Sequence, residues 1–139
     1  MPKHQKKPRK LTDIVGLNET DASKLKKCGI QIVEDLVNKT GTPKARAAIS
    51  EATGISKRTI SEWAIRAELL MIDGIGPEYA RLLEKAGVDS APELALQDPK
   101  KLHKKMVEAN KRHVVNRVPS EREVNRWIRQ ALRSPGRRS

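Results

Sequence analysis

Aromatic residues are almost absent from this chain of 139 residues, which has no phenylalanine, one tyrosine and two tryptophans. A core must therefore be built from Leu, Ile, Val and Ala, and unpaired bases would find few rings on which to stack. No segment approaches the run of about 18 apolar residues that a membrane-spanning helix needs. The first residues lack the apolar stretch of a signal peptide. These absences predict a cytoplasmic protein that does not enter a membrane.

Catalytic and metal-binding patterns are also missing. The single cysteine, Cys28, has no partner for an internal disulfide, which fits a reducing compartment, and we expect it to be a small core residue. His4, His103 and His113 are not spaced as metal ligands. There is no glycine-rich nucleotide loop with its lysine. The sequence therefore predicts a protein that is not an enzyme and has no metal or cofactor.

Positive charge is abundant, with a net charge of +12, and most of it lies at the two ends. Residues 1–10 contain five Lys and Arg residues and no acid, and residues 133–139 contain three arginines. We expect both segments to be disordered basic tails. Such tails are common on proteins that bind nucleic acid or ribosomes, and they also increase solubility.

The region between the tails contains an internal repeat. Ile14–Leu17 (IVGL) matches Ile72–Ile75 (IDGI) at an offset of 58 residues. Two copies of one helical unit are therefore predicted, over residues 11–70 and 71–132. Each copy should contain a glycine turn, a helix, a short helix and two further helices. The first two helices are expected at about 19–28 and 32–39 in the first copy, and at about 77–86 and 90–96 in the second.

The last two helices of each copy have recognisable starts and faces. Thr42-Pro43 and Asp98-Pro99 each predict an N-cap followed by proline at the first helical position. Trp63 and Trp127 lie on apolar stripes at helical spacing, which indicates core positions rather than base stacking. Two features are specific to the second copy: a capping box at Ser120 and Glu123, and an extra loop around residues 111–118.

The stretch Ile72–Pro77 (IDGIGP) organises the second copy. Gly74 and Gly76 permit positive φ in a tight turn, and Pro77 suits a helix start. This pattern resembles the helix-hairpin-helix motif. The resemblance implies that backbone N–H groups of the turn and of the next helix start bind a nucleic-acid phosphate.

Outside the tails, the chain also resembles a bacterial family of unknown function with paired helix-hairpin-helix units. Gly54–Trp63, Leu70–Gly76 and Glu84–Ser90 carry this resemblance. It implies an all-α fold of two tandem units and adds little about biochemistry.

The two turns differ as phosphate sites. Asp73 and Glu78 would repel a phosphate at the second turn, and Arg81 and Lys85 farther along the helix supply compensating charge. In the first copy Asn18 replaces the second glycine, and we expect it to tolerate positive φ. The alternative is that both turns only connect helices. The candidate contacts are Gly74, Ile75, Gly76, Arg81 and Lys85, with Gly16, Leu17 and Asn18 as the weaker set.

Residues 48–63 resemble a helix-turn-helix as well, with Lys57 and Arg58 near the start of its second helix. The repeat partner of this segment lacks that character, so a packed helical pair is the simpler interpretation. The densest basic region outside the tails forms a helix face through i, i+4 pairs, which could follow a phosphate backbone or be an ordinary solvated surface. Its lysines are Lys100, Lys101, Lys104 and Lys105, and the amino-terminal candidates are Lys3, Lys6, Lys7, Arg9 and Lys10.

Together these features predict a nucleic-acid-binding protein that contacts phosphates with little sequence specificity. Duplex DNA is the first choice of partner, and structured RNA, including that of the ribosome, is the second. A location at the nucleoid or ribosome would follow. The rival hypothesis is a protein-interaction module whose turns are only structural, and the acidic residues at both turns favour it.

Overall fold

The computed structural model describes residues 9–133, and these fold into eight α-helices and two short 3-10 helices. Their one β pairing is an isolated antiparallel bridge between Lys10 and Ile32, so the all-α prediction is confirmed. The chain divides into two compact units, one that ends at Ala67 (unit 1) and one that begins at Glu68 (unit 2).

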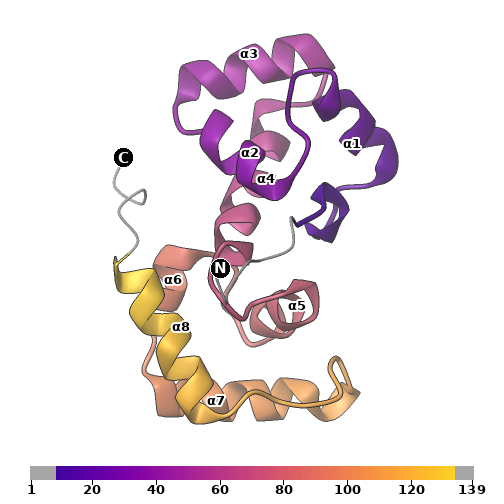
Figure 1. The fold of residues 1–139 in the computed structure, drawn as a ribbon. Helices are drawn as coiled ribbons and strands as arrows, with labels where there is room; N and C mark the ends of the chain where they lie inside the picture. The colour runs from indigo at the N-terminus through magenta and orange to yellow at the C-terminus, as the bar shows by residue number, and fades with distance from the viewer. Residues whose placement is uncertain (1–8, 134–139) are drawn as a thin grey trace, which may run out of the picture. The chain divides into compact units, whose positions relative to one another are not determined.

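Unit 1 is built from short helices that surround a core of aliphatic residues and Trp63. Helix α1 contacts both the 3-10 helix η1 and α3. The last three residues of α4 lie past the division, in unit 2. The elements are η1 (Leu11–Asp13), α1 (Glu19–Lys26), α2 (Val33–Lys39), α3 (Pro43–Thr53) and α4 (Lys57–Leu70), shown in Figure 1.

Unit 2 repeats this order and adds a loop before its last helix. Helix α8 packs against α6 and α7, and α7 contacts α5 (Figure 1). Its core contains apolar side chains from α5, α6, α7 and α8 together with Trp127. The elements are α5 (Pro77–Lys85), α6 (Ala91–Ala95), α7 (Pro99–Ala109), the 3-10 helix η2 (Asn110–Arg112) and α8 (Glu121–Arg133).

Helix starts follow the local sequence signals. The Thr42 hydroxyl accepts a hydrogen bond from the Ala45 N–H at 3.1 Å, and the Asp98 carboxylate accepts one from the Lys101 N–H at 3.0 Å. Proline occupies the first turn of α3 and of α7, where its missing N–H would have no helical partner. Both predicted N-caps are confirmed.

Each unit places a tryptophan beside its glycine turn. A Cβ atom added to Gly74 would lie 2.8 Å from Trp127 Nε1, and one added to Gly16 would lie 4.0 Å from Trp63 Nε1. Both tryptophans are 3% exposed, so their predicted core positions are confirmed. The indole ring thus joins the last helix of each unit to the turn with which that unit begins.

The residue three positions after each tryptophan binds the backbone of the same turn. Arg66 Nη1 donates to the Val15 carbonyl at 3.3 Å in unit 1. In unit 2 the Gln130 side-chain oxygen accepts from the Asp73 N–H at 3.0 Å. Val15 and Asp73 each precede the turn glycine, so the sequence repeat is also a repeat of contacts.

The extra loop of unit 2 is attached to α5 and to α8. The Tyr79 hydroxyl donates to the Arg117 carbonyl at 2.9 Å, and the Arg117 guanidinium makes two hydrogen bonds to the Glu123 carboxylate at 3.2 and 3.1 Å. Ser120 and Glu123 form the predicted capping box, with bonds of 2.8 and 3.1 Å. The hydrogen bond from Arg117, followed by that from the Ser120 backbone, lowers the pKa of Glu123.

Alanine at Gly74 is expected to destabilise the protein more than alanine at Gly16. The two glycines have φ of +92° and +90°, so both variants incur about 1–2 kcal/mol for a left-handed residue with a side chain. Only Gly74→Ala also brings Cβ to 2.8 Å from Trp127, since the nearest atom at Gly16 is 3.8 Å away. Urea unfolding measures both losses, and equal losses would contradict a constraint imposed by Trp127.

Glu123→Gln is expected to destabilise the protein at neutral pH and to lose this effect in acid. Because its pKa is lowered from the ordinary 4.5, the ionised Glu123 stabilises the fold above that pH. This contribution disappears as the pH falls through the lowered pKa. Thermal unfolding at neutral and acidic pH tests the variant beside Glu51→Gln, which changes an exposed side chain of α3. A difference from wild type that persists in acid would contradict the charge effect.

Candidate nucleic-acid interface

The turn of unit 2 (residues 72–76) uses its two glycines differently. Gly74 has a φ of +92°, in the left-handed region that favours glycine. Gly76 has φ −94° and ψ −174°, an extended conformation open to any residue, and it is the N-cap of α5. The expectation of positive φ therefore holds for Gly74 and is wrong for Gly76. The absence of a side chain at Gly76 instead leaves the start of α5 without a side-chain cap.

Helix α5 begins without a side-chain cap. The backbone N–H groups of Gly76, Glu78 and Tyr79 donate to no other residue within 9–133, and Pro77 has no N–H. A Cβ added to Gly76 would meet nothing within 4 Å. The helix dipole places partial positive charge at this end. The geometry therefore leaves donors and space for an anion.

The turn of unit 1 (residues 14–18) is closed at the same place. Asn18 is the N-cap of α1 with φ −99°, and its side-chain oxygen accepts from the Asp21 N–H at 2.9 Å. The expectation that Asn18 adopts positive φ is therefore wrong, because Gly16 already supplies the left-handed residue of this turn. Asn18 instead occupies one of the donors that an anion would need.

Two of the apolar turn residues lie inside the units. Ile75 is fully buried, and its N–H donates to the Ile72 carbonyl at 3.1 Å. Leu17 is also buried, and its N–H donates to the Ile14 carbonyl at 3.1 Å. Their roles are to anchor and close the turns, so neither offers a group to a ligand.

The basic candidates of unit 2 lie on α5 and α7. Arg81 and Lys85 are exposed one turn apart on α5, and the acidic Asp73 and Glu78 are exposed nearer to the turn. Helix α7 has a buried side and a basic side, because Leu102 and its neighbour Met106 are fully buried while its lysines are exposed. The exposed lysines are Lys100, Lys101, Lys104 and Lys105.

The remaining candidates belong to unit 1 or lie outside the described residues. Lys57 and Arg58 are exposed at the start of α4, and Arg58 pairs with Glu62 at 3.7 Å. Arg9 and Lys10 of the expected tail are attached to unit 1, since the Arg9 carbonyl accepts from the Val33 N–H at 3.0 Å and Lys10 forms the bridge to Ile32. The candidates at positions 3, 6 and 7 (Lys3, Lys6 and Lys7) fall outside residues 9–133.

Four exposed arginines on α8 were missed among the candidates. Glutamates at 121 and 123 flank the first arginine at the start of α8. Charge summed along the chain therefore does not show that the arginines share one helix face. The spacing of four, three and four residues is the signal that reveals it, because this spacing keeps side chains on one helix face. The residues are Arg122, Arg126, Arg129 and Arg133.

Residues 9–133 also bear on the expectations for metal ligands, membrane helices and Cys28. No group of three or more His, Cys, Asp or Glu residues within 9–133 could hold a metal ion. None of the helices described is long and apolar enough to cross a membrane. Cys28 is half-buried in the turn after α1 rather than part of the core, so the prediction of a core cysteine is wrong.

Comparison with known proteins identifies a family. A model described as a domain of unknown function (DUF4332) matches residues 15–134. Curated proteins and solved structures give no match. The family match agrees with the resemblance to a family of unknown function that the sequence indicated. Because the matched residues make up most of the chain, the protein belongs to the DUF4332 family.

Proposed function

We propose that this protein binds duplex nucleic acid, with DNA as the preferred partner, and that the start of α5 in unit 2 holds one backbone phosphate. The observation that carries the proposal is the uncapped start of α5, where the Gly76, Glu78 and Tyr79 N–H groups have no acceptor within the described residues. The resemblance of Ile72–Pro77 to the helix-hairpin-helix motif assigns the same groups to a phosphate.

The nearby acidic residues do not outweigh these donors. Asp73 and Glu78 are exposed, and two unit charges 4 Å apart in water interact by only about 1 kcal/mol. Salt screens such exposed charges further. A hydrogen bond to a charged group contributes about 1.5–3 kcal/mol. Two or three such bonds to a phosphate therefore exceed the repulsion.

Duplexes fit this chain better than single strands do. Trp63 and Trp127 are buried, and Tyr79 lies 5.5 Å from Trp127 between ring centres, with its hydroxyl bonded to the Arg117 carbonyl. These are all of the aromatic residues in the sequence. No aromatic ring is therefore placed as a platform for unpaired bases. The exposed lysines of α7 would add phosphate contacts that do not depend on base sequence.

A protein-interaction module is the second candidate, and exposed apolar side chains favour it. Leu96 at the end of α6 is 80% exposed and Leu132 on α8 is 65% exposed. Such residues occur singly on many surfaces, so they carry less weight than the donors at α5. Structured RNA stays within the first proposal, because it offers the same phosphates.

Gly76→Asn is expected to weaken duplex binding by about tenfold or more while it stabilises the fold slightly. Asparagine at this N-cap reproduces Asn18 of unit 1 and occupies an N–H group that a phosphate would use. Gly76→Ala adds a side chain that cannot cap, so it should destabilise by about 1 kcal/mol and still bind. Fluorescence anisotropy with labelled duplex DNA, duplex RNA and single-stranded DNA measures affinity, and urea unfolding measures stability.

Gly76→Asn should thus raise stability and lower affinity, whereas Gly76→Ala should lower stability and leave affinity unchanged. A loss of binding that followed the loss of stability would contradict the phosphate site. Equal binding by wild type, Gly76→Asn and Gly76→Ala would show that the turn only connects helices. If wild type bound no duplex, the search would pass to protein partners.

A further inference from the structure

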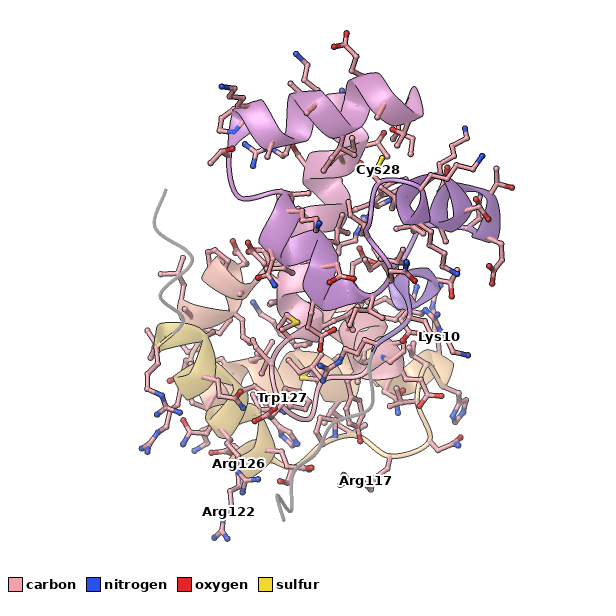
Figure 2. All side chains as sticks on the ribbon, turned by 45° about the horizontal axis from the view of Figure 1, so that its top comes forward. Lys10, Cys28, Arg117, Arg122, Arg126 and Trp127 are labelled. Atoms are coloured by element: carbon pink, nitrogen blue, oxygen red, sulfur yellow. The ribbon has the colours of Figure 1, made fainter. Side chains whose placement is uncertain are left out.

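The arginine row of α8 (Arg122, Arg126, Arg129 and Arg133) is a charged surface on one face of one helix. All four side chains are exposed, whereas Val124, Trp127, Ile128 and Ala131 on the other side of α8 are buried. Figure 2 shows Arg122 and Arg126 on the outer side of α8. One face of the helix therefore packs in the core of unit 2, and the opposite face carries the four arginines.

The arginine row carries no ion pair that would explain it as a stabilising feature. None of its four members forms a salt bridge or side-chain hydrogen bond with another residue of the described chain. Arg117 and Arg58, by contrast, each pair with a glutamate. Four like charges spaced three and four residues apart on a helix repel one another. The row thus has a small cost in stability that no contact within residues 9–133 offsets.

The arginine row lies next to the contact between α8 and the turn before α5. The Gln130 side chain binds the Asp73 backbone N–H at 3.0 Å, which fixes that part of α8 against the turn before α5. Arg126 precedes Gln130 by four residues and Arg133 follows it by three, so both lie one helical turn from the contact. A phosphate backbone at the start of α5 would therefore pass close to the arginine row.

Unit 1 lacks the arginine row at equivalent positions. The contacts of Trp63 and Trp127 with their turns set an offset of 64 residues between the last helices. At this offset Arg126 corresponds to Glu62 and Arg129 to Ile65, which is 44% exposed. The counterpart of Arg122 is Arg58, which pairs with Glu62. The turn that is closed by Asn18 thus lies in the unit that lacks the arginine row.

We propose that the arginine row is a second contact line for the backbone of duplex DNA and confines binding to unit 2, an inference that rests on the proposed function for its partner class. Eleven residues of helix separate Arg122 from Arg133, or about 16 Å at 1.5 Å per residue. Each DNA strand carries one phosphate per about 3.4 Å of duplex axis, so a row of this length can reach more than one. One guanidinium group can bind two phosphate oxygens at once through two parallel hydrogen bonds.

The test compares Arg126→Gln/Arg129→Gln with a matched control in the full chain. The control is Lys24→Gln/Lys27→Gln, which removes two exposed charges at the same spacing from unit 1. Anisotropy with labelled duplex DNA over a salt series gives the affinity and its salt slope. The arginine variant should bind about tenfold more weakly, with a slope reduced by about 2, one for each lost phosphate contact. The control should keep the wild-type slope.

Each other outcome has a separate meaning. Equal losses in the two variants would overturn the inference, because they would reflect net charge rather than position. If Gly76→Asn weakened binding and the arginine variant did not, the row would be a solvated face and the α5 site would stand. If wild type bound no duplex DNA, the proposed function itself would fail. Arg126→Lys/Arg129→Lys should keep the wild-type slope, because lysine retains the charge. If the wild-type protein bound duplex RNA more tightly than duplex DNA, RNA rather than DNA would be the partner.

Discussion

The contact between a tryptophan ring and a turn glycine is the constraint on which unit 2 depends. Trp127 fills the space that a side chain at position 74 would need, and Gly74 also supplies the left-handed residue of the turn. Two independent requirements thus fall on one residue. The contact closes the unit end to end, because it joins the last helix to the first turn. Unit 1 uses the same arrangement with more room at Gly16.

Much of the fold could be predicted from the sequence because its signals are local. N-caps, helix-opening prolines and the capping box at Ser120 each involve neighbours along the chain. The conformation of Asn18 could not be predicted, because asparagine suits both a positive φ and an N-cap, and the choice depends on the whole turn. The contact between Gln130 and Asp73 could not be predicted either, because the two residues are 57 positions apart and neither segment has a sequence pattern that indicates it.

The candidate site was only partly predictable for a related reason. Gly74 and Gly76 stand out in the sequence, yet they serve different purposes that only the backbone angles distinguish. Charge summed along the chain does not reveal the arginine row, because Glu121 and Glu123 flank Arg122 in sequence but lie at other angles around the helix. Position around the helix axis matters more here than net charge.

The difference between Asn18 and Gly76 has a consequence for how duplicated units diverge. Asparagine and glycine differ by only a few tenths of a kcal/mol at an N-cap, so an exchange between them leaves the helix folded. The same exchange fills or frees one of the donors at the helix start. One copy of a repeat can therefore gain or lose an anion site in a single substitution that selection for stability would hardly detect. In such a family, the residue at this N-cap would distinguish ligand-binding copies from purely structural ones.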